Sequence, residues 1–137
     1  MTALIRGGCL CGAVRFETRD VHSQCFCYCT SCRRAAGAPV VPWGTVERSA
    51  FSITQGAVRE VRSSERVLRG FCATCGTSLT YQHDSKPAEL DVALATFDDL
   101  TVPQPQCHLW VEDKPSWLVI GDALPQFLRD RRSGTAH

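Results

Sequence analysis

Nine cysteines among 137 residues are the side chains in this sequence most able to do chemistry. Their number is odd, and the first residues lack the charged start and long apolar stretch of a signal peptide, so a secreted disulfide framework explains them poorly. In a reducing compartment, clustered cysteines bind metal ions or act as reactive thiols. We therefore expect a cytoplasmic protein whose cysteines hold metal.

Two pairs of cysteines lie far apart in the sequence and are flanked by glycines, in segments 7–12 (GGCLCG) and 71–77 (FCATCGT). Alternate residues of an extended segment point to one side, and a C-x-x-C turn brings two sulfurs within reach of one ion. A thioredoxin-like redox pair in the second segment is the alternative, but no βαβ pattern surrounds it. Four thiolates make a closed site, so we expect a structural zinc on Cys9, Cys11, Cys72 and Cys75.

A further group of cysteines lies in segment 25–34 (CFCYCTSCRR). On a strand its first three cysteines share one face, and the last two form another C-x-x-C. We expect Cys27, Cys29 and Cys32 to bind a second zinc through three thiolates, which leaves a fourth position open, as in catalytic zinc sites. Cys25 either closes that position, which would make the site structural, or is a free buried thiol.

Charge indicates what an open three-cysteine zinc site is suited to. Three thiolates leave a divalent ion at a charge of about −1, which makes it a weak Lewis acid toward water but a good soft site for another thiol. A bound thiolate would lower this charge further, so nearby cations should help. Arg33 and Arg34 follow Cys32 directly, and we expect them to supply that field or to hold a substrate carboxylate. The alternative is that both arginines are solvated surface residues.

The segments that must position these cysteines are predicted to be short strands. Runs of β-branched and aromatic residues alternate with Gly, Pro, Ser or charged breaks, which predicts a mostly β fold in one domain, residues 1–137. Short helical pieces are expected at Thr30–Ala36 and Asp122–Leu128, and residues 129–137 are expected to fray. The expected strands are Ala13–Thr18, Val21–Tyr28, Val40–Val46, Phe51–Thr54, Val58–Arg62, Arg66–Phe71, Ser78–Gln82, Leu90–Ala95, His108–Val111 and Trp117–Ile120.

Composition argues against two classes of partner. The formal net charge is +1, whereas a dedicated nucleic-acid binder is normally much more basic. No apolar run reaches the length that crosses a bilayer. We therefore expect neither nucleic acid nor membrane as a partner, and the sequence sets no oligomeric state.

The three cysteine motifs, in this order and with these flanking glycines, resemble the glutathione-dependent formaldehyde-activating enzyme family, also called the CENP-V/GFA domain. The first extends through residues 7–16 (GGCLCGAVRF) and the second covers residues 27–34. Segments 105–110 (PQCHLW) and 114–117 (KPSW) resemble the C-terminal part of the family. The resemblance thus covers nearly the whole chain.

This resemblance implies a Mss4-like fold of folded β-sheets, a β-tent, clipped by zinc. It also implies the same two zinc ions per chain, of which the second has fewer ligands and is more easily lost. The reaction that names the family joins glutathione to formaldehyde and gives S-hydroxymethylglutathione, and its members are grouped as carbon–sulfur lyases. We therefore expect a zinc enzyme with a small thiol substrate such as glutathione. The alternative is a non-catalytic, zinc-stabilised binding module in which both metal sites are structural.

Two residues depart from the family pattern, and one more matches it. Tyr28 stands where the family often has His, between the first two cysteines of the second site, and Cys25 is an additional cysteine beside that site. His108 matches a family His position. We expect His108 either to donate to the second zinc's ligands or to carry protons, with a plain structural histidine as the alternative.

Overall fold

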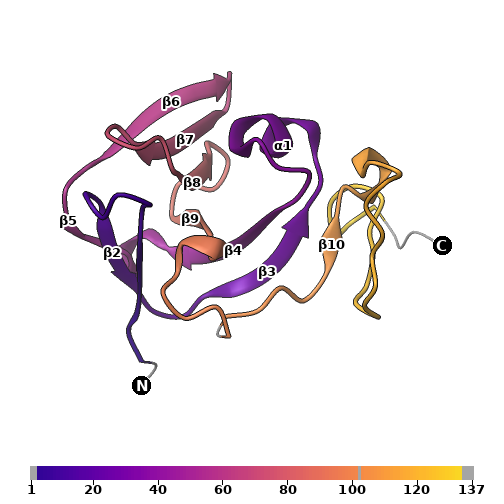
Figure 1. The fold of residues 1–137 in the computed structure, drawn as a ribbon, viewed down its shortest axis with the longest axis horizontal. Coiled ribbons are helices and arrows are strands. Elements are labelled where there is room, and N and C mark those ends of the chain that lie inside the picture. The colour runs from indigo at the N-terminus through magenta and orange to yellow at the C-terminus, as the bar shows by residue number, and fades with distance from the viewer. Residues whose placement is uncertain (1–2, 102, 134–137) are drawn as a thin grey trace.

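The computed structural model describes residues 3–101 and 103–133, which fold into two β-sheets with one α-helix (Figure 1). The α-helix is α1 (Thr30–Ala36), and three single-turn helices are η1 (Arg48–Ala50), η2 (Leu94–Thr96) and η3 (Val111–Asp113). The strands are β1 (Ile5–Gly8), β2 (Arg15–Thr18), β3 (His22–Cys27), β4 (Val41–Glu47), β5 (Ser52–Gln55), β6 (Val58–Ser64), β7 (Val67–Cys72), β8 (Ser78–His83), β9 (Glu89–Ala93) and β10 (His108–Leu109).

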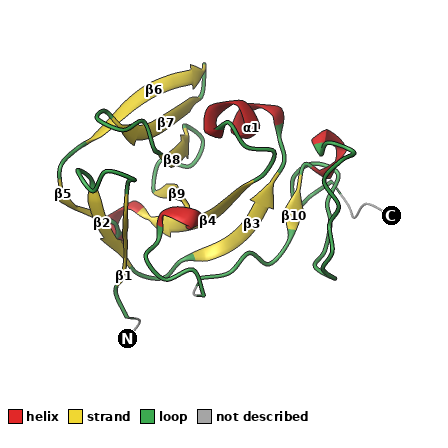
Figure 2. Ribbon diagram, viewed as in Figure 1, coloured by secondary structure: helices red, strands yellow, loops and turns green. Residues whose placement is uncertain are grey.

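The larger sheet has the strand order β10–β3–β4–β9–β8–β7–β6, and the smaller sheet has the order β1–β2–β5. Paired strands run antiparallel, except that β10 lies parallel to β3. Strands dominate the view coloured by secondary structure (Figure 2). The predicted mostly β, Mss4-like class of fold is thus confirmed. Among the described residues, no helix is both long and apolar enough to span a bilayer.

Two expected elements are absent from the structure, and one observed strand was not expected. Strand β1 was not expected, because its short sequence IRGG carries two glycines and little β-branched character. The apolar run Trp117–Ile120 forms no strand, and Trp117 is 74% and Val119 83% exposed. The stretch Asp122–Leu128 forms no helix, and within it Gln126 makes an isolated bridge to His108.

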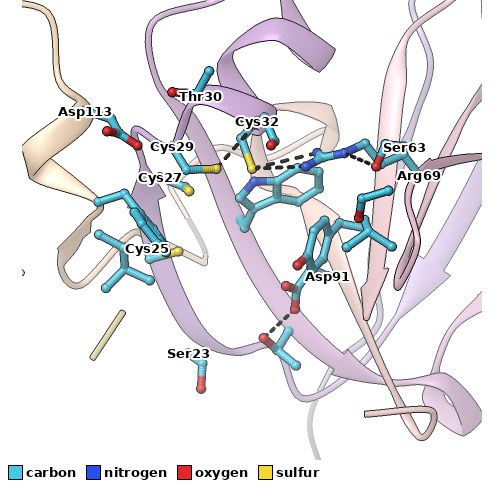
Figure 3. A pocket seen from close by; sticks show the side chains of 18 of the residues that line it. Ser23, Cys25, Cys27, Cys29, Thr30, Cys32, Ser63, Arg69, Asp91 and Asp113 are labelled. Atoms are coloured by element: carbon cyan, nitrogen blue, oxygen red, sulfur yellow. Dashed lines mark hydrogen bonds between the residues drawn. The ribbon is translucent and has the colours of Figure 1, made fainter. Parts of the chain in front are cut away.

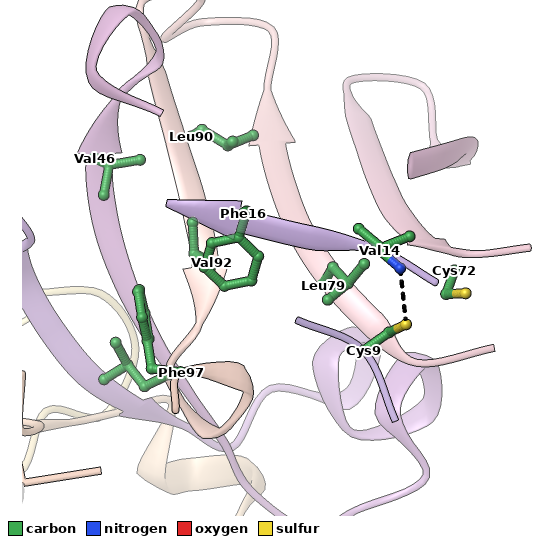
Figure 4. Close-up of a cluster of buried hydrophobic side chains, with 10 residues drawn as sticks. Cys9, Val14, Phe16, Val46, Cys72, Leu79, Leu90, Val92 and Phe97 are labelled. Carbon is green, nitrogen blue, oxygen red and sulfur yellow. Dashed lines mark hydrogen bonds between the residues drawn. The ribbon is translucent and has the colours of Figure 1, made fainter. Parts of the chain in front are cut away.

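The main core lies between the two sheets (Figure 4). Phe16 of β2 is 2% exposed and packs against the rings of Phe51 and Phe97, with centroids 5.3 Å away in both cases. Cys9 and Cys72 belong to this same buried cluster. A metal ion on those two cysteines would therefore join the rim of the small sheet to the large one.

A second buried cluster surrounds the other cysteines. It includes Cys25, Cys27, Trp43 and Leu109, all from β3 and its neighbours in the large sheet. Because side chains alternate along a strand, Cys25 and Cys27 face one side of β3 and Phe26 faces the other. Strand β3 therefore separates a cysteine-lined side from an aromatic side.

The C-terminal segment returns beside β10 and is tied to the body of the protein. The carbonyl of Arg129 accepts a hydrogen bond from the Trp110 N–H at 2.8 Å. The Nη2 group of Arg131 donates to the Ser23 carbonyl at 2.7 Å. Residues 129–137 were expected to fray. Residues 129–133 instead make the contacts given above, and residues 134–137 lie outside the described part of the chain.

Candidate metal centres

The first candidate metal centre joins two turns that are distant in sequence. Cys9 and Cys11 follow β1, Cys72 ends β7, and Cys75 lies in the turn before β8. The four sulfurs lie within 4.8 Å of one another, and the Sγ–Sγ distances are 3.6 Å for Cys9–Cys11 and 3.9 Å for Cys11–Cys72. Tetrahedral zinc with Zn–S bonds of about 2.3 Å places its sulfurs about 3.8 Å apart. The four-cysteine group therefore has the dimensions of a closed zinc site.

Uncharged donors surround the four-cysteine group. The backbone N–H of Val14 donates to the Cys9 sulfur at 3.2 Å and lowers the pKa of that thiol (Figure 4). The Thr77 hydroxyl lies 3.1 Å from the Cys75 sulfur, and with the Thr77 backbone N–H it lowers the pKa of Cys75 to about 5. Gly76 has a φ of 81°, which an L side chain rarely adopts, and this tightens the turn. Donors of this kind stabilise thiolates, the form that binds metal.

The second candidate metal centre spans the junction of β3 and α1 (Figure 3). Cys27 is the last residue of β3, Cys29 is the N-cap residue of α1, and Cys32 lies in the first turn of the helix. The Cys29 sulfur accepts a hydrogen bond from the Cys32 N–H at 3.3 Å. The three sulfurs lie within 4.8 Å of one another. A strand that leads directly into a helix thus gathers this short cysteine run into one three-cysteine group.

Cys25 lines the same cavity but lies outside this group. Within the described residues, the sulfurs that lie within 4.8 Å of one another at this junction are those of Cys27, Cys29 and Cys32. Burial raises the pKa of the Cys25 thiol to about 12. The structure therefore favours a free, neutral thiol at Cys25 over a fourth ligand that closes the site.

A buried arginine that the sequence analysis did not single out contacts the three-cysteine group. Arg69 of β7 is 6% exposed, and its Nη1 and Nη2 both lie 3.7 Å from the Cys32 sulfur. Its Nε donates to the Ser63 hydroxyl at 3.0 Å, and its guanidinium lies 5.0 Å from the centre of the Tyr81 ring. These contacts fix both arms of the guanidinium on one sulfur. The feature of the sequence that could have identified Arg69 is its charge in the middle of the expected strand Arg66–Phe71.

The charge of the three-cysteine group is concentrated on one sulfur. The facing thiols of Cys27 and Cys29, together with the Arg69 guanidinium, lower the pKa of Cys32 to about 2. The pKa of Cys27 is raised, because its thiol hydrogen-bonds to the sulfurs of Cys29 and Cys32 and because it is buried. The group thus loses one proton readily and keeps the others until a cation compensates the added charge.

A cavity of about 410 Å³ opens beside the three-cysteine group. This volume suits a small organic molecule or a short peptide. Its apolar walls include Trp43, Tyr81 and Leu109, and its charged walls include Arg69 and Asp91. Figure 3 shows Asp91 and Ser23 on the side of the cavity away from the three cysteines.

The two arginines expected to serve the second site lie elsewhere on the helix. Arg33 and Arg34 are in the last turn of α1, and neither lines the cavity. Arg34 is exposed and Arg33 is half-buried. Their roles stay predictions, while the positive charge that touches a sulfur belongs to Arg69.

His108 also lies apart from the three-cysteine group. Its ring stacks on Phe26, which faces the opposite side of β3 from Cys27, with centroids 4.9 Å apart. Its Nδ1 lies 2.7 Å from the Tyr28 hydroxyl, and its Nε2 lies 2.9 Å from an oxygen of Asp122. Both ring nitrogens are therefore engaged away from the sulfurs, and the contacts match the structural alternative for His108.

The chain is similar to known proteins both in sequence and in fold. The family model described as "Glutathione-dependent formaldehyde-activating enzyme" matches residues 4–113. A Halomonas elongata protein, whose name marks it as an inferred enzyme of this kind, is 32% identical over 133 residues, which cover 85% of this chain and 81% of the relative. A crystal structure of a Rhodobacter sphaeroides protein superposes with a TM-score of 0.61 at 25% identity, over 73% of this chain and 96% of that one. The chain belongs to the glutathione-dependent formaldehyde-activating enzyme family.

Proposed function

We propose that the protein is a zinc-dependent carbon–sulfur lyase that forms or cleaves the adduct of a thiol and an aldehyde, with glutathione and formaldehyde as the substrates. The observation that carries this proposal is the three-cysteine group, which opens on a cavity and touches a buried guanidinium. A closed structural site needs neither feature. Free cysteines and thiol substrates both suit the reducing cytoplasm, where we place the protein.

Both cysteine groups fit zinc in their donor chemistry. Thiolates are preferred zinc ligands, and the sulfur spacing of the four-cysteine group matches a tetrahedral ion. In the three-cysteine group, Cys27, Cys29 and Cys32 would hold a second zinc, which we expect to be lost more easily. When bound there, zinc would supply a soft Lewis acid that favours the thiolate form of a substrate thiol.

The residues of the chain would prepare the cavity for an anionic sulfur. With three thiolates and a divalent ion the centre has a charge of about −1, and a substrate thiolate would make it more negative. The buried Arg69 guanidinium places one positive charge against Cys32 and offsets part of this. The apolar walls formed by Trp43 and Leu109 lower the local dielectric constant, which strengthens that attraction.

The reaction needs no oxidant and no covalent bond to the protein. In the forward direction, the thiol sulfur forms a bond to the aldehyde carbon, and the proton of the thiol ends on the former carbonyl oxygen. In the reverse direction, the carbon–sulfur bond breaks, and the thiol and aldehyde leave. The cavity contributes by holding the two reactants together.

The sharpest test replaces Cys32 by serine and counts zinc. We expect Cys32→Ser to stay folded, to keep about one zinc per chain, and to lose both glutathione binding and formation of S-hydroxymethylglutathione. Cys25→Ser is the matched control, because Cys25 lines the same cavity outside the three-cysteine group; it should keep two zinc ions and full activity. Turnover that survives Cys32→Ser would refute the mechanism.

The alternative of a non-catalytic binding module would require the second site to be closed. The sequence suggested Cys25 as the fourth ligand that would close the second metal site. Among the described residues, however, its sulfur is not part of the three-cysteine group. Calorimetric titration with glutathione separates the two functions, since a module with two structural sites would bind no thiol.

A further inference from the structure

The cavity beside the three-cysteine group adjoins a second cavity of about 420 Å³. The two cavities share the lining residues Ser23, Thr45, Tyr81, Asp91 and Arg131. The second is lined largely by polar and charged side chains. A molecule whose sulfur lies at the cysteines and whose other end is charged would therefore meet these shared residues.

Asp91 of β9 provides a negative charge at the junction of the cavities. The Thr45 hydroxyl donates to its Oδ1 at 2.7 Å, as drawn in Figure 3. Among the described residues, the Asp91 carboxylate is in no ion pair. Burial raises the pKa of this carboxyl, and the charge of Lys86, which lines the second cavity, offsets only part of this, so the ionised form lacks full compensation from the protein. A ligand that brings an ammonium group would supply the missing partner.

Arg131 provides a positive charge at the same junction, held by an unusual backbone conformation. Its Nη2 donates to the Ser23 carbonyl at 2.7 Å. Ser23 has a φ of 54°, and the pairing of β3 with β4 is irregular between His22 and Cys25. Irregularities of this kind redirect groups at functional sites. Here the carbonyl anchors one arm of the guanidinium and leaves its other N–H groups for a carboxylate.

We propose that Asp91 and Arg131 form a subsite for an α-amino acid group, an ammonium and a carboxylate on one carbon, at the far end of a peptide thiol. In glutathione this group is the free end of the γ-glutamyl residue. The subsite rests on the function proposed above, because it assumes that the sulfur lies at the three-cysteine group. A zwitterion adds no net charge, whereas a lone carboxylate would be repelled by Asp91 and a lone ammonium by Arg131.

The test uses the zinc-loaded protein and three matched tripeptide thiols. Glutathione carries both charges, glutaryl-Cys-Gly lacks the ammonium, and 4-aminobutyryl-Cys-Gly lacks the carboxylate. We expect Asp91→Asn to weaken glutathione binding about tenfold and to strengthen binding of glutaryl-Cys-Gly, whose lone carboxylate Asp91 repels. Arg131→Gln should weaken glutathione binding similarly and strengthen binding of 4-aminobutyryl-Cys-Gly, whose lone ammonium Arg131 repels. Arg132→Gln, which removes a charge that lines the second cavity alone, is the control and should change none of the three affinities.

The outcomes separate the subsite from the proposed function. 2-Mercaptoethanol has no amino acid group, so it should bind the wild type and both variants equally. If neither it nor glutathione binds the wild type, the proposed function fails. If both bind but Asp91→Asn and Arg131→Gln weaken all the tripeptides equally or none of them, the subsite is wrong. S-methylglutathione keeps the amino acid group without a free thiol, and its weaker binding should show the same sensitivity to both variants.

Discussion

The four-cysteine group and the three-cysteine group use the same ligand atom in different surroundings. The first lies at the edge of the main core and receives hydrogen bonds from Val14 and Thr77, which carry no charge. The second lies beside a cavity and contacts the Arg69 guanidinium. Hydrogen bonds from uncharged donors suffice for a site that only holds a metal ion, whereas a site that admits a further anion needs a cation in direct contact with a ligand sulfur.

The two groups also differ in how far apart in the sequence their ligands lie. Cys11 and Cys72 are 61 residues apart, so a metal ion on the first group would close a long loop and join two sheets. The ligands of the second group come from one short junction between β3 and α1. The first group should therefore govern folding, and the second should govern chemistry.

The largest effect should come from breaking the four-cysteine group. We expect Cys72→Ser to abolish cooperative folding, because apparent zinc affinities of structural sites, about 10–16 kcal/mol, match or exceed the whole stability of a domain. Circular dichroism and zinc content measure this, with Cys32→Ser as the comparison. A Cys72→Ser protein that melts like the wild type would remove the contrast between the two groups.

The next effect should come from Arg69, which distinguishes the three-cysteine group. We expect Arg69→Met to weaken glutathione binding by about 1.5–3 kcal/mol, or about ten- to a hundredfold, because a charged hydrogen-bond donor is lost from a buried anionic site. Arg69→Lys keeps the charge without the fork and should fall between. The comparison variant, Arg33→Gln, removes a charge from α1 outside the cavity and tests the role predicted for that residue; a clearly smaller loss than for Arg69→Met would assign the charge effect to Arg69. Equal losses for Arg33→Gln and Arg69→Met would mean that net charge alone acts.

The sequence was sufficient to predict both cysteine groups, because the spacing that makes a ligand set is local. Each C-x-C or C-x-x-C run fixes its own sulfurs, and flanking glycines identify the turns. Most strands followed from their β-branched and aromatic runs. Strand β1 did not, because two of its four residues are glycine, and Trp117–Ile120 failed because apolar character alone does not provide a neighbouring strand.

The residues around the second group could not be predicted in the same way. Arg33 follows Cys32 in sequence, but consecutive helical residues point about 100° apart, so adjacency did not bring it into the cavity. Arg69 reaches Cys32 from 37 positions away, through the order of the strands in the large sheet. His108 of β10 pairs with Phe26 of β3, and its ring lies on the aromatic side of that strand. This position depends on the register between β10 and β3, which no local motif encodes.

A smaller effect, on stability alone, is expected at Tyr28. This residue stands between two candidate ligands in sequence, but its hydroxyl bonds His108 on the other side of β3. We expect Tyr28→Phe to lower stability by about 1–3 kcal/mol, because a ring nitrogen of His108, which is 3% exposed, loses its partner. Zinc content and glutathione affinity should not change. Lost affinity with an unchanged melting temperature would assign Tyr28 to the three-cysteine group after all.

The smallest effect should have the opposite sign. Burial raises the pKa of Asp91 above its ordinary value, so between the two values the folded protein binds more protons than the unfolded chain, and stability falls as pH rises through that window. Asp91→Asn removes this loss while its amide oxygen can still accept the Thr45 hydrogen bond. We expect a gain of on the order of 1 kcal/mol at pH 8 that shrinks as the pH is lowered toward the ordinary pKa of an aspartate, measured as the difference in melting temperature between variant and wild type with zinc present. A variant less stable at every pH would make Asp91 a structural residue. A more stable variant that binds glutathione poorly would show that the cavity, unlike the four-cysteine group, holds a charge that opposes folding and serves binding.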